Sequence, residues 1–105
     1  ARALGLALLG ERLTAEEAAA WGLIWRCVDD AELGPVADEL CARLAQGPTR
    51  GLVATRQALH AAAANSLEQQ LDLERDLQRE LGYGDDYREG VAAFVGKRAP
   101  RFTGR

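Results

Sequence analysis

The chain has 105 residues, which is the size of one small domain with a modest core. Its 13 basic and 16 acidic residues are evenly mixed and give a formal net charge of -3, which argues against a nucleic-acid-binding surface or a patch attracted to membranes. No apolar run reaches the length of a bilayer and no signal-peptide pattern is visible, so we expect a soluble, cytoplasmic protein.

The N-terminal segment, residues 2–9, is rich in helix formers, and Gly10 stands where a left-handed residue would end a helix. The chain contains no Met, and Ala1 leads directly into this apolar pattern without a capping residue before it. We therefore expect the chain to be a fragment of a longer protein.

A second helix is predicted to follow Thr14, because Thr14 and Glu17 have the spacing of a capping box. It should end at Trp21. Residues 23–28 are apolar, β-branched or aromatic, and they predict a short extended segment. Trp21 and Trp25 could line an acyl pocket, but their places beside a turn and a strand are typical of core anchors, more clearly for Trp21.

Three further helices are predicted, with Pro35 in the first turn of one, a second over residues 49–64 and a third over residues 66–81. Ser66 and Gln69 have the spacing of another capping box. Each helix carries an apolar stripe that we expect to face inward: Val36, Leu40, Cys41 and Leu44; Leu52, Val53 and Leu59; and Leu67, Leu71, Leu73, Leu77 and Leu81.

The two cysteines, Cys27 and Cys41, fall in an apolar segment and on an apolar helix face. Neither has a second cysteine at the spacing of a metal site or a redox motif. We expect two buried free thiols and no disulfide.

The acidic residues of the long helix repeat at four-residue spacing, as Asp72, Asp76 and Glu80, and superficially resemble a metal-binding face. Arg75 and Arg79 lie between them at ion-pairing distances along a helix. The pattern therefore favours a solvated face with salt bridges, and we predict no metal site.

No catalytic residue is predicted. His60 is the only histidine and has no Ser or Cys nucleophile in a recognisable motif, so a solvated or packing role is favoured. The pairs Asp29-Asp30 and Asp85-Asp86 stand at helix starts, where carboxylates cap amides and complement the helix dipole.

The last predicted helix begins at Asp85 or Asp86 and puts Tyr87, Val91, Phe94 and Val95 on one face. Phe94 and Lys97 are three residues apart near its end, so an aromatic ring and an ammonium group should be neighbours on that face. Such a pair could pack against the adenine of a CoA thioester and neutralise its phosphates. Equally, Phe94 fits the buried stripe and Lys97 would complement the helix dipole without any ligand.

The elements together predict an all-α fragment of five or six helices with one short extended segment, forming a single helical region over residues 1–105. Three stretches then carry a resemblance to a known family: GERLTAEEAAAWGLIWRCVDD (10–30), LDLERDLQRELG (71–82) and DDYREGVAAFVGKR (85–98). They resemble the C-terminal part of the enoyl-CoA hydratase/isomerase family, the crotonases. Within the family they are most similar to the branch that isomerises a ring-epoxidised phenylacetyl-CoA in phenylacetate catabolism.

This resemblance implies a parent enzyme with a spiral of ββα turns, absent here, followed by helices that build trimers or hexamers. In the family, a Phe and a Lys of an AFxxKR motif contact the CoA of a neighbouring subunit, which implies CoA-binding roles for Phe94 and Lys97. Gly96 departs from the motif, because many members have a larger helix former there. The resemblance implies no cofactor, since CoA is part of the substrate thioester.

Two functions from different classes remain open. The first is an acyl-CoA isomerase or hydratase, of which this chain alone should be inactive because its oxyanion donors and catalytic carboxylates cannot be assigned to any residue present. The second is a non-catalytic helical module that serves only oligomerisation.

Overall fold

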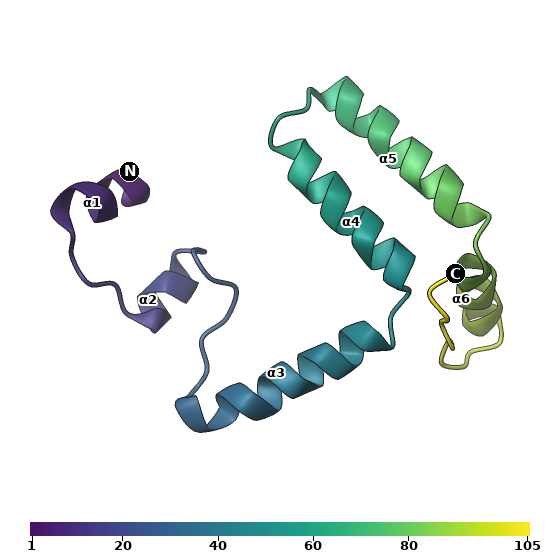
Figure 1. The fold of residues 1–105 in the computed structure, drawn as a ribbon, viewed down its shortest axis with the longest axis horizontal. Coiled ribbons are helices and arrows are strands. Elements are labelled where there is room, and N and C mark those ends of the chain that lie inside the picture. Colours follow the sequence, from purple (N-terminus) through teal and green to yellow (C-terminus); the bar gives the residue numbers. More distant parts are fainter. The chain divides into compact units, whose positions relative to one another are not determined.

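The computed structural model describes residues 1–105 and contains six helices and no strand, which confirms the predicted all-α class (Figure 1). The chain divides into two compact units, residues 1–37 and residues 38–105. The helices are α1 (Arg2–Leu9), α2 (Ala15–Ala20), α3 (Asp30–Ala45), α4 (Thr49–Ala62), α5 (Leu67–Gly82) and α6 (Asp85–Val95).

In the first unit, the two predicted helix boundaries are confirmed. Helix α1 stops at Gly10, which has φ 63° and donates its N–H to the carbonyl of Leu6. Helix α2 starts with the complete capping box: Glu17 N–H donates to Thr14 Oγ1 at 3.2 Å, and Thr14 N–H donates to Glu17 Oε2 at 3.1 Å.

The segment 23–28, which we predicted to be extended, contains no strand; residues 21–25 form turns and bends. Gly22 has φ 78°, and the N–H groups of Gly22 and Leu23 bond to the carbonyls of Ala19 and Ala18 at 3.1 and 2.9 Å. This is the Schellman arrangement that ends a helix. The first backbone donors of the segment therefore satisfy α2, and no neighbouring strand pairs with the rest.

The expected burial of two side chains in this chain was wrong. Trp25 is 81% exposed and Cys41 is exposed, because no other part of the chain covers them. Trp21 is 38% exposed and has the guanidinium of Arg2 5.3 Å from its ring centroid, a cation–π contact. Cys27 is half-buried, and both thiols are free.

Helix α3 begins at Asp30, so Pro35 lies inside the helix and not in its first turn as predicted. Asp30 and Glu32 in the first turn complement the positive end of the helix dipole and account for the earlier start.

Helices α4 and α5 of the second unit form an antiparallel pair that lies side by side (Figure 1). Ser66 and Gln69 form the predicted capping box at the start of α5, with distances of 2.8 and 3.3 Å. The amide of Gln70 donates to the carbonyl of Ala58 on α4 at 3.1 Å. Ala54 is buried, and its small side chain allows the two helices to approach closely.

The apolar stripes are only partly covered within this chain. The α5 residues Leu73, Leu77 and Leu81 are half-buried, whereas Leu59 and Leu67 are 69% and 78% exposed. Their predicted inward orientation is wrong for this chain, because α4 and α5 cover only the facing edge of each other.

The solvated, salt-bridged face predicted for α5 is confirmed. Arg75 reaches Asp72 at 2.7 Å and Asp76 at 3.1 Å, and Arg79 reaches Asp76 at 3.6 Å. All four side chains are about half exposed or more, so each pair contributes at most about 1 kcal/mol. None of the six helices is both long enough and apolar enough to cross a membrane.

Candidate functional site: the end of α6 and the C-terminal tail

The tail, residues 96–105, turns back after α6 and runs beside it (Figure 1). Helix α6 ends at Val95, and Lys97 has φ 48°, the only residue other than glycine with a positive φ. Arg98 N–H donates to the carbonyl of Ala93 at 3.0 Å and Lys97 N–H to that of Phe94 at 3.2 Å, which is again the Schellman arrangement. A lysine in this left-handed position is strained by about 1 kcal/mol.

This turn corrects the predicted relation between Phe94 and Lys97. Lys97 lies beyond the helix, so the two side chains do not share a helical face as we expected. Phe94 is 86% exposed and does not belong to a buried stripe. Lys97 is also exposed and has no carboxylate within ion-pairing distance. Both groups are therefore free to meet a ligand, with Lys97 placed by the backbone turn.

Glu89 of α6 binds the tail at its first half. The guanidinium of Arg98 donates to both carboxylate oxygens, at 2.6 and 2.8 Å, and the backbone N–H of Arg101 donates to Oε1 at 2.7 Å. The hydrogen bond from Arg98, followed by that from Arg101, lowers the pKa of Glu89 from 4.5 to about 2. The Glu89 side chain is 24% exposed, so this bidentate pair is partly shielded from water.

Asp86 binds the second half of the tail. Its Oδ1 accepts the N–H of Thr103 at 2.7 Å, its Oδ2 accepts the N–H of Gly104 at 2.9 Å, and its own N–H donates to the carbonyl of Arg105 at 3.0 Å. Asp86 is 8% exposed and is the only buried charged residue. We call Asp86 and Glu89 together the tail clasp.

The tail clasp corrects the predicted capping role of the pair Asp85-Asp86. The N-cap residue of α6 is Gly84, which makes no side-chain capping bond, and both aspartates lie in the first helical turn. Asp85 pairs only with Arg88, at 2.9 Å on the surface. Sequence reasoning missed Asp86, Glu89 and Arg98 as a set. The available signal was two acids three residues apart on the last helix, followed by a basic tail that contains a proline.

An apolar pocket of about 410 Å³ opens in the second unit where α4 begins, α5 ends and α6 meets the tail. Gly90 opens room for the half-buried ring of Phe102, because a Cβ at Gly90 would lie 3.7 Å from that ring. The pocket could accept a planar apolar group. Its lining residues are Pro48, Arg50, Gly51, Leu81, Gly84, Asp86, Tyr87, Gly90, Val91, Phe94, Phe102 and Arg105.

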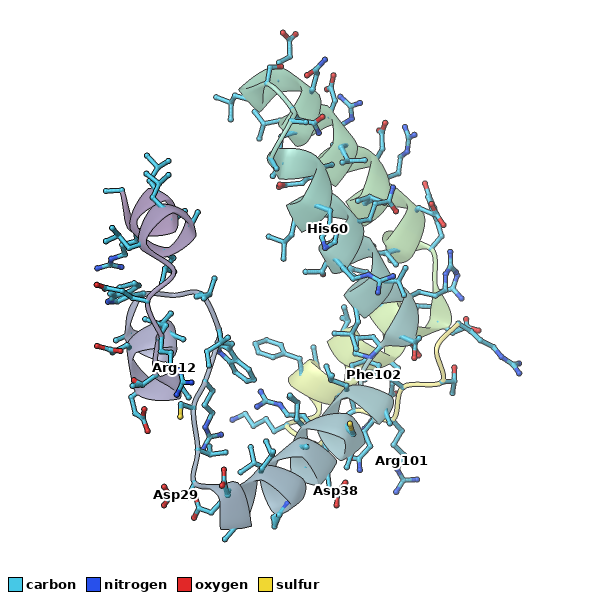
Figure 2. The ribbon with its side chains drawn as sticks, turned by 60° about the vertical axis from the view of Figure 1, so that its left-hand side comes forward. Arg12, Asp29, Asp38, His60, Arg101 and Phe102 are labelled. Carbon is cyan, nitrogen blue, oxygen red and sulfur yellow. The ribbon has the colours of Figure 1, made fainter.

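The groups that could perform acid–base or metal chemistry are not gathered here. Figure 2 shows His60 on α4, whereas Arg101 and Phe102 stand on the tail, and His60 is exposed. No three His, Cys, Asp or Glu side chains are arranged to hold a metal ion. The site offers an aromatic ring, an ammonium group and an apolar pocket, which are means of binding.

Comparisons with known proteins match the complete chain. The family profile described as Enoyl-CoA hydratase/isomerase matches residues 1–105. The chain is 55% identical over 105 residues to the 1,2-epoxyphenylacetyl-CoA isomerase of Escherichia coli (strain K12), covering 100% of this chain and 40% of that protein.

Solved structures agree with the sequence comparison. The enoyl-CoA hydratase subunit I of Geobacillus kaustophilus matches with a TM-score of 0.94 at 35% identity, over 99% of this chain and 40% of that one. The enoyl-CoA hydratase of Mycobacterium tuberculosis matches with a TM-score of 0.89 at 26% identity, over 99% and 41%. The chain thus spans about 40% of the length of the relatives that it matches.

Proposed function

The chain belongs to the enoyl-CoA hydratase/isomerase family, and from that membership we propose that it is the C-terminal, CoA-covering helical part of an acyl-CoA isomerase or hydratase. Identity of 55% with an isomerase of 1,2-epoxyphenylacetyl-CoA supports that thioester as the substrate of the whole enzyme. The catalytic groups then belong to a part of the enzyme that this chain does not contain, and the chain alone is inactive.

The observation that carries the proposal is the pairing of exposure and strain at the end of α6. Phe94 exposes 86% of its surface to water, and Lys97 occupies a left-handed conformation that a glycine would adopt without strain. Strained residues persist where the surrounding structure holds them, and they concentrate at functional sites. An adenine ring stacking on Phe94 and a phosphate meeting Lys97 would give each group a partner.

Titration of the full-length protein with an acyl-CoA tests the contact. Lys97→Ala should weaken binding about twofold to fivefold at low salt, as for an exposed ion pair, and the loss should shrink at high salt. Phe94→Ala should weaken binding by about fivefold or more, with little salt dependence, because base stacking is not a charge interaction.

Two matched variants serve as controls for these substitutions. Val95→Ala removes an exposed apolar side chain from the same helical turn, and Arg56→Ala removes an exposed cation from α4. Neither should change the affinity. If both Phe94→Ala and Lys97→Ala bind acyl-CoA as the wild type does at low salt, the proposed contact is refuted.

The proposed substrate is tested by turnover. The full-length protein should isomerise 1,2-epoxyphenylacetyl-CoA faster, in kcat/KM, than it hydrates a straight-chain enoyl-CoA. A preference for the enoyl-CoA would keep the acyl-CoA proposal and remove the epoxide as the substrate.

The second candidate is a non-catalytic helical oligomerisation module, and the exposed apolar side chains of α1 and α5 favour it. Leu8 and Leu67 are each 78% exposed. Apolar surface of this kind commonly marks an interface between proteins, and a homo-oligomer is our proposal for either candidate. An oligomer that neither binds nor converts acyl-CoA thioesters would select the module.

A further inference from the structure

The conformation of Lys97 is held by the residues on both sides of it. On the helix side, Gly96 N–H donates to the carbonyl of Ala92 at 2.9 Å. On the tail side, Arg98 is fixed twice: its N–H bonds to the carbonyl of Ala93, and its guanidinium forms the bidentate pair with Glu89. With both neighbours fixed, the backbone at Lys97 has to pass through the left-handed region.

Glu89 is well suited to fix this turn. A planar guanidinium and a planar carboxylate joined by two bonds define an orientation as well as a distance, which a single bond to a lysine would not do. The same carboxylate accepts the Arg101 N–H at 2.7 Å, so it also holds the chain three residues beyond Arg98. The Glu89 side chain is the least exposed acid among the ion pairs of the chain.

Anchoring of the tail alone does not require this arrangement. Asp86 already holds the distal residues Thr103 and Gly104. A glycine at position 97 would form the same turn without strain. The strained residue is the one whose exposed ammonium has no partner in the chain.

We propose that Glu89 and Arg98 are positioning residues, which hold Lys97 in its left-handed conformation and so present its ammonium to a phosphate of the CoA thioester. This inference rests on the proposed CoA contact of Lys97. It assigns to an ion pair on α6 and the tail an effect on ligand affinity that neither member exerts by touching the ligand.

A double-mutant cycle in the full-length protein tests the coupling. Glu89→Gln keeps the shape of the side chain and removes its charge. It should weaken acyl-CoA binding by no more than Lys97→Ala does, about twofold to fivefold at low salt, and the loss should shrink at high salt. In the Lys97→Ala background, Glu89→Gln should cause no further loss of affinity.

Arg98→Lys is a second test, because it keeps the positive charge and loses the bidentate geometry. Its effect should have the same sign as that of Glu89→Gln and should also vanish in the Lys97→Ala background. Asp85→Asn is the matched control: it neutralises an acid of the same helix whose ion pair with Arg88 is exposed, and it should leave the affinity unchanged. Thr103 amide exchange reports whether the distal tail is still bound in each variant.

The outcomes separate the two proposals. If Glu89→Gln and Lys97→Ala lose affinity additively, Glu89 has a general structural role and the positioning inference is overturned, while the CoA contact of Lys97 stands. If Lys97→Ala alone has no effect on acyl-CoA affinity, the CoA contact itself fails and Lys97 has nothing to be positioned for. A coupled loss that disappears with Lys97 supports both.

Discussion

Removal of the Asp86 carboxylate should release the distal end of the tail while α6 stays folded. Asp86 is 8% exposed and accepts the N–H groups of Thr103 and Gly104 at 2.7 and 2.9 Å. Hydrogen bonds to a charged group contribute about 1.5–3 kcal/mol each. Since the released amides return to water, we take the lower value for both and expect Asp86→Ala to cost about 3 kcal/mol of local stability.

Amide hydrogen exchange measures this cost at the residues concerned. A loss of about 3 kcal/mol corresponds to roughly 100-fold faster exchange of the Thr103 and Gly104 amides, if they exchange by local opening. Asp86→Asn should lie between wild type and Asp86→Ala, because its amide keeps one oxygen acceptor and turns an NH2 group toward the second donor.

Asp85→Ala is the matched control, because it removes the same charge from the same helical turn. Asp85 and its partner Arg88 are 70% and 67% exposed, so their ion pair contributes about 0–1 kcal/mol and the tail amides should stay protected. If Thr103 and Gly104 keep wild-type exchange rates in Asp86→Ala, the reasoning on the tail clasp is refuted. Equal acceleration by both alanine variants would instead indicate a general charge effect on α6.

Four other outcomes are expected. Lys97→Gly should raise the unfolding free energy by about 1 kcal/mol, since glycine adopts φ 48° without strain, and should weaken acyl-CoA binding; lower thermal stability would contradict it. Gly90→Ala should stabilise α6 by about 0.5–1 kcal/mol in denaturant unfolding, because the new Cβ lies at an ordinary 3.7 Å from Phe102, and a loss of stability would show overpacking there. Because the folded-state pKa of Glu89 is depressed, its contribution is complete above pH 4.5 and is lost as the pH falls toward about 2; Arg101 amide protection should follow that window and lose it in Glu89→Gln. The purified 105-residue chain should convert neither enoyl-CoA nor epoxy-CoA thioesters, and turnover that co-purifies with it would disprove this.

The helix boundaries that the sequence predicted correctly depend on contacts between near neighbours. The capping boxes of Thr14 with Glu17 and of Ser66 with Gln69 each join residues three apart, and Gly10 ends α1 by its own conformation. Such signals are complete within one helical turn, so the sequence alone displays them. The same locality made the ion pairs along α5 predictable.

The errors arose where a residue had two local possibilities and a contact from elsewhere decided between them. Residues 23–28 have the composition of a strand, but their first amides complete the end of α2 and no strand lies beside them. Asp86 has the position of a helix cap, but its carboxylate binds the tail 17 and 18 residues away. Composition and spacing do not encode which of these competing bonds forms.

The candidate site shows the same division. By itself, the sequence determined an all-α chain, its principal helices and the presence of an aromatic and a cation, Phe94 and Lys97, near the last helix end. Only the tertiary structure decided that Lys97 lies outside the helix in a left-handed turn, and that Glu89 and Asp86 bind the returning tail. The reason is physical: a helix forms from bonds between residues four apart, whereas the fold-back of the tail depends on buried and bidentate hydrogen bonds between residues 9 to 18 apart, whose pairing exists only after the chain has turned.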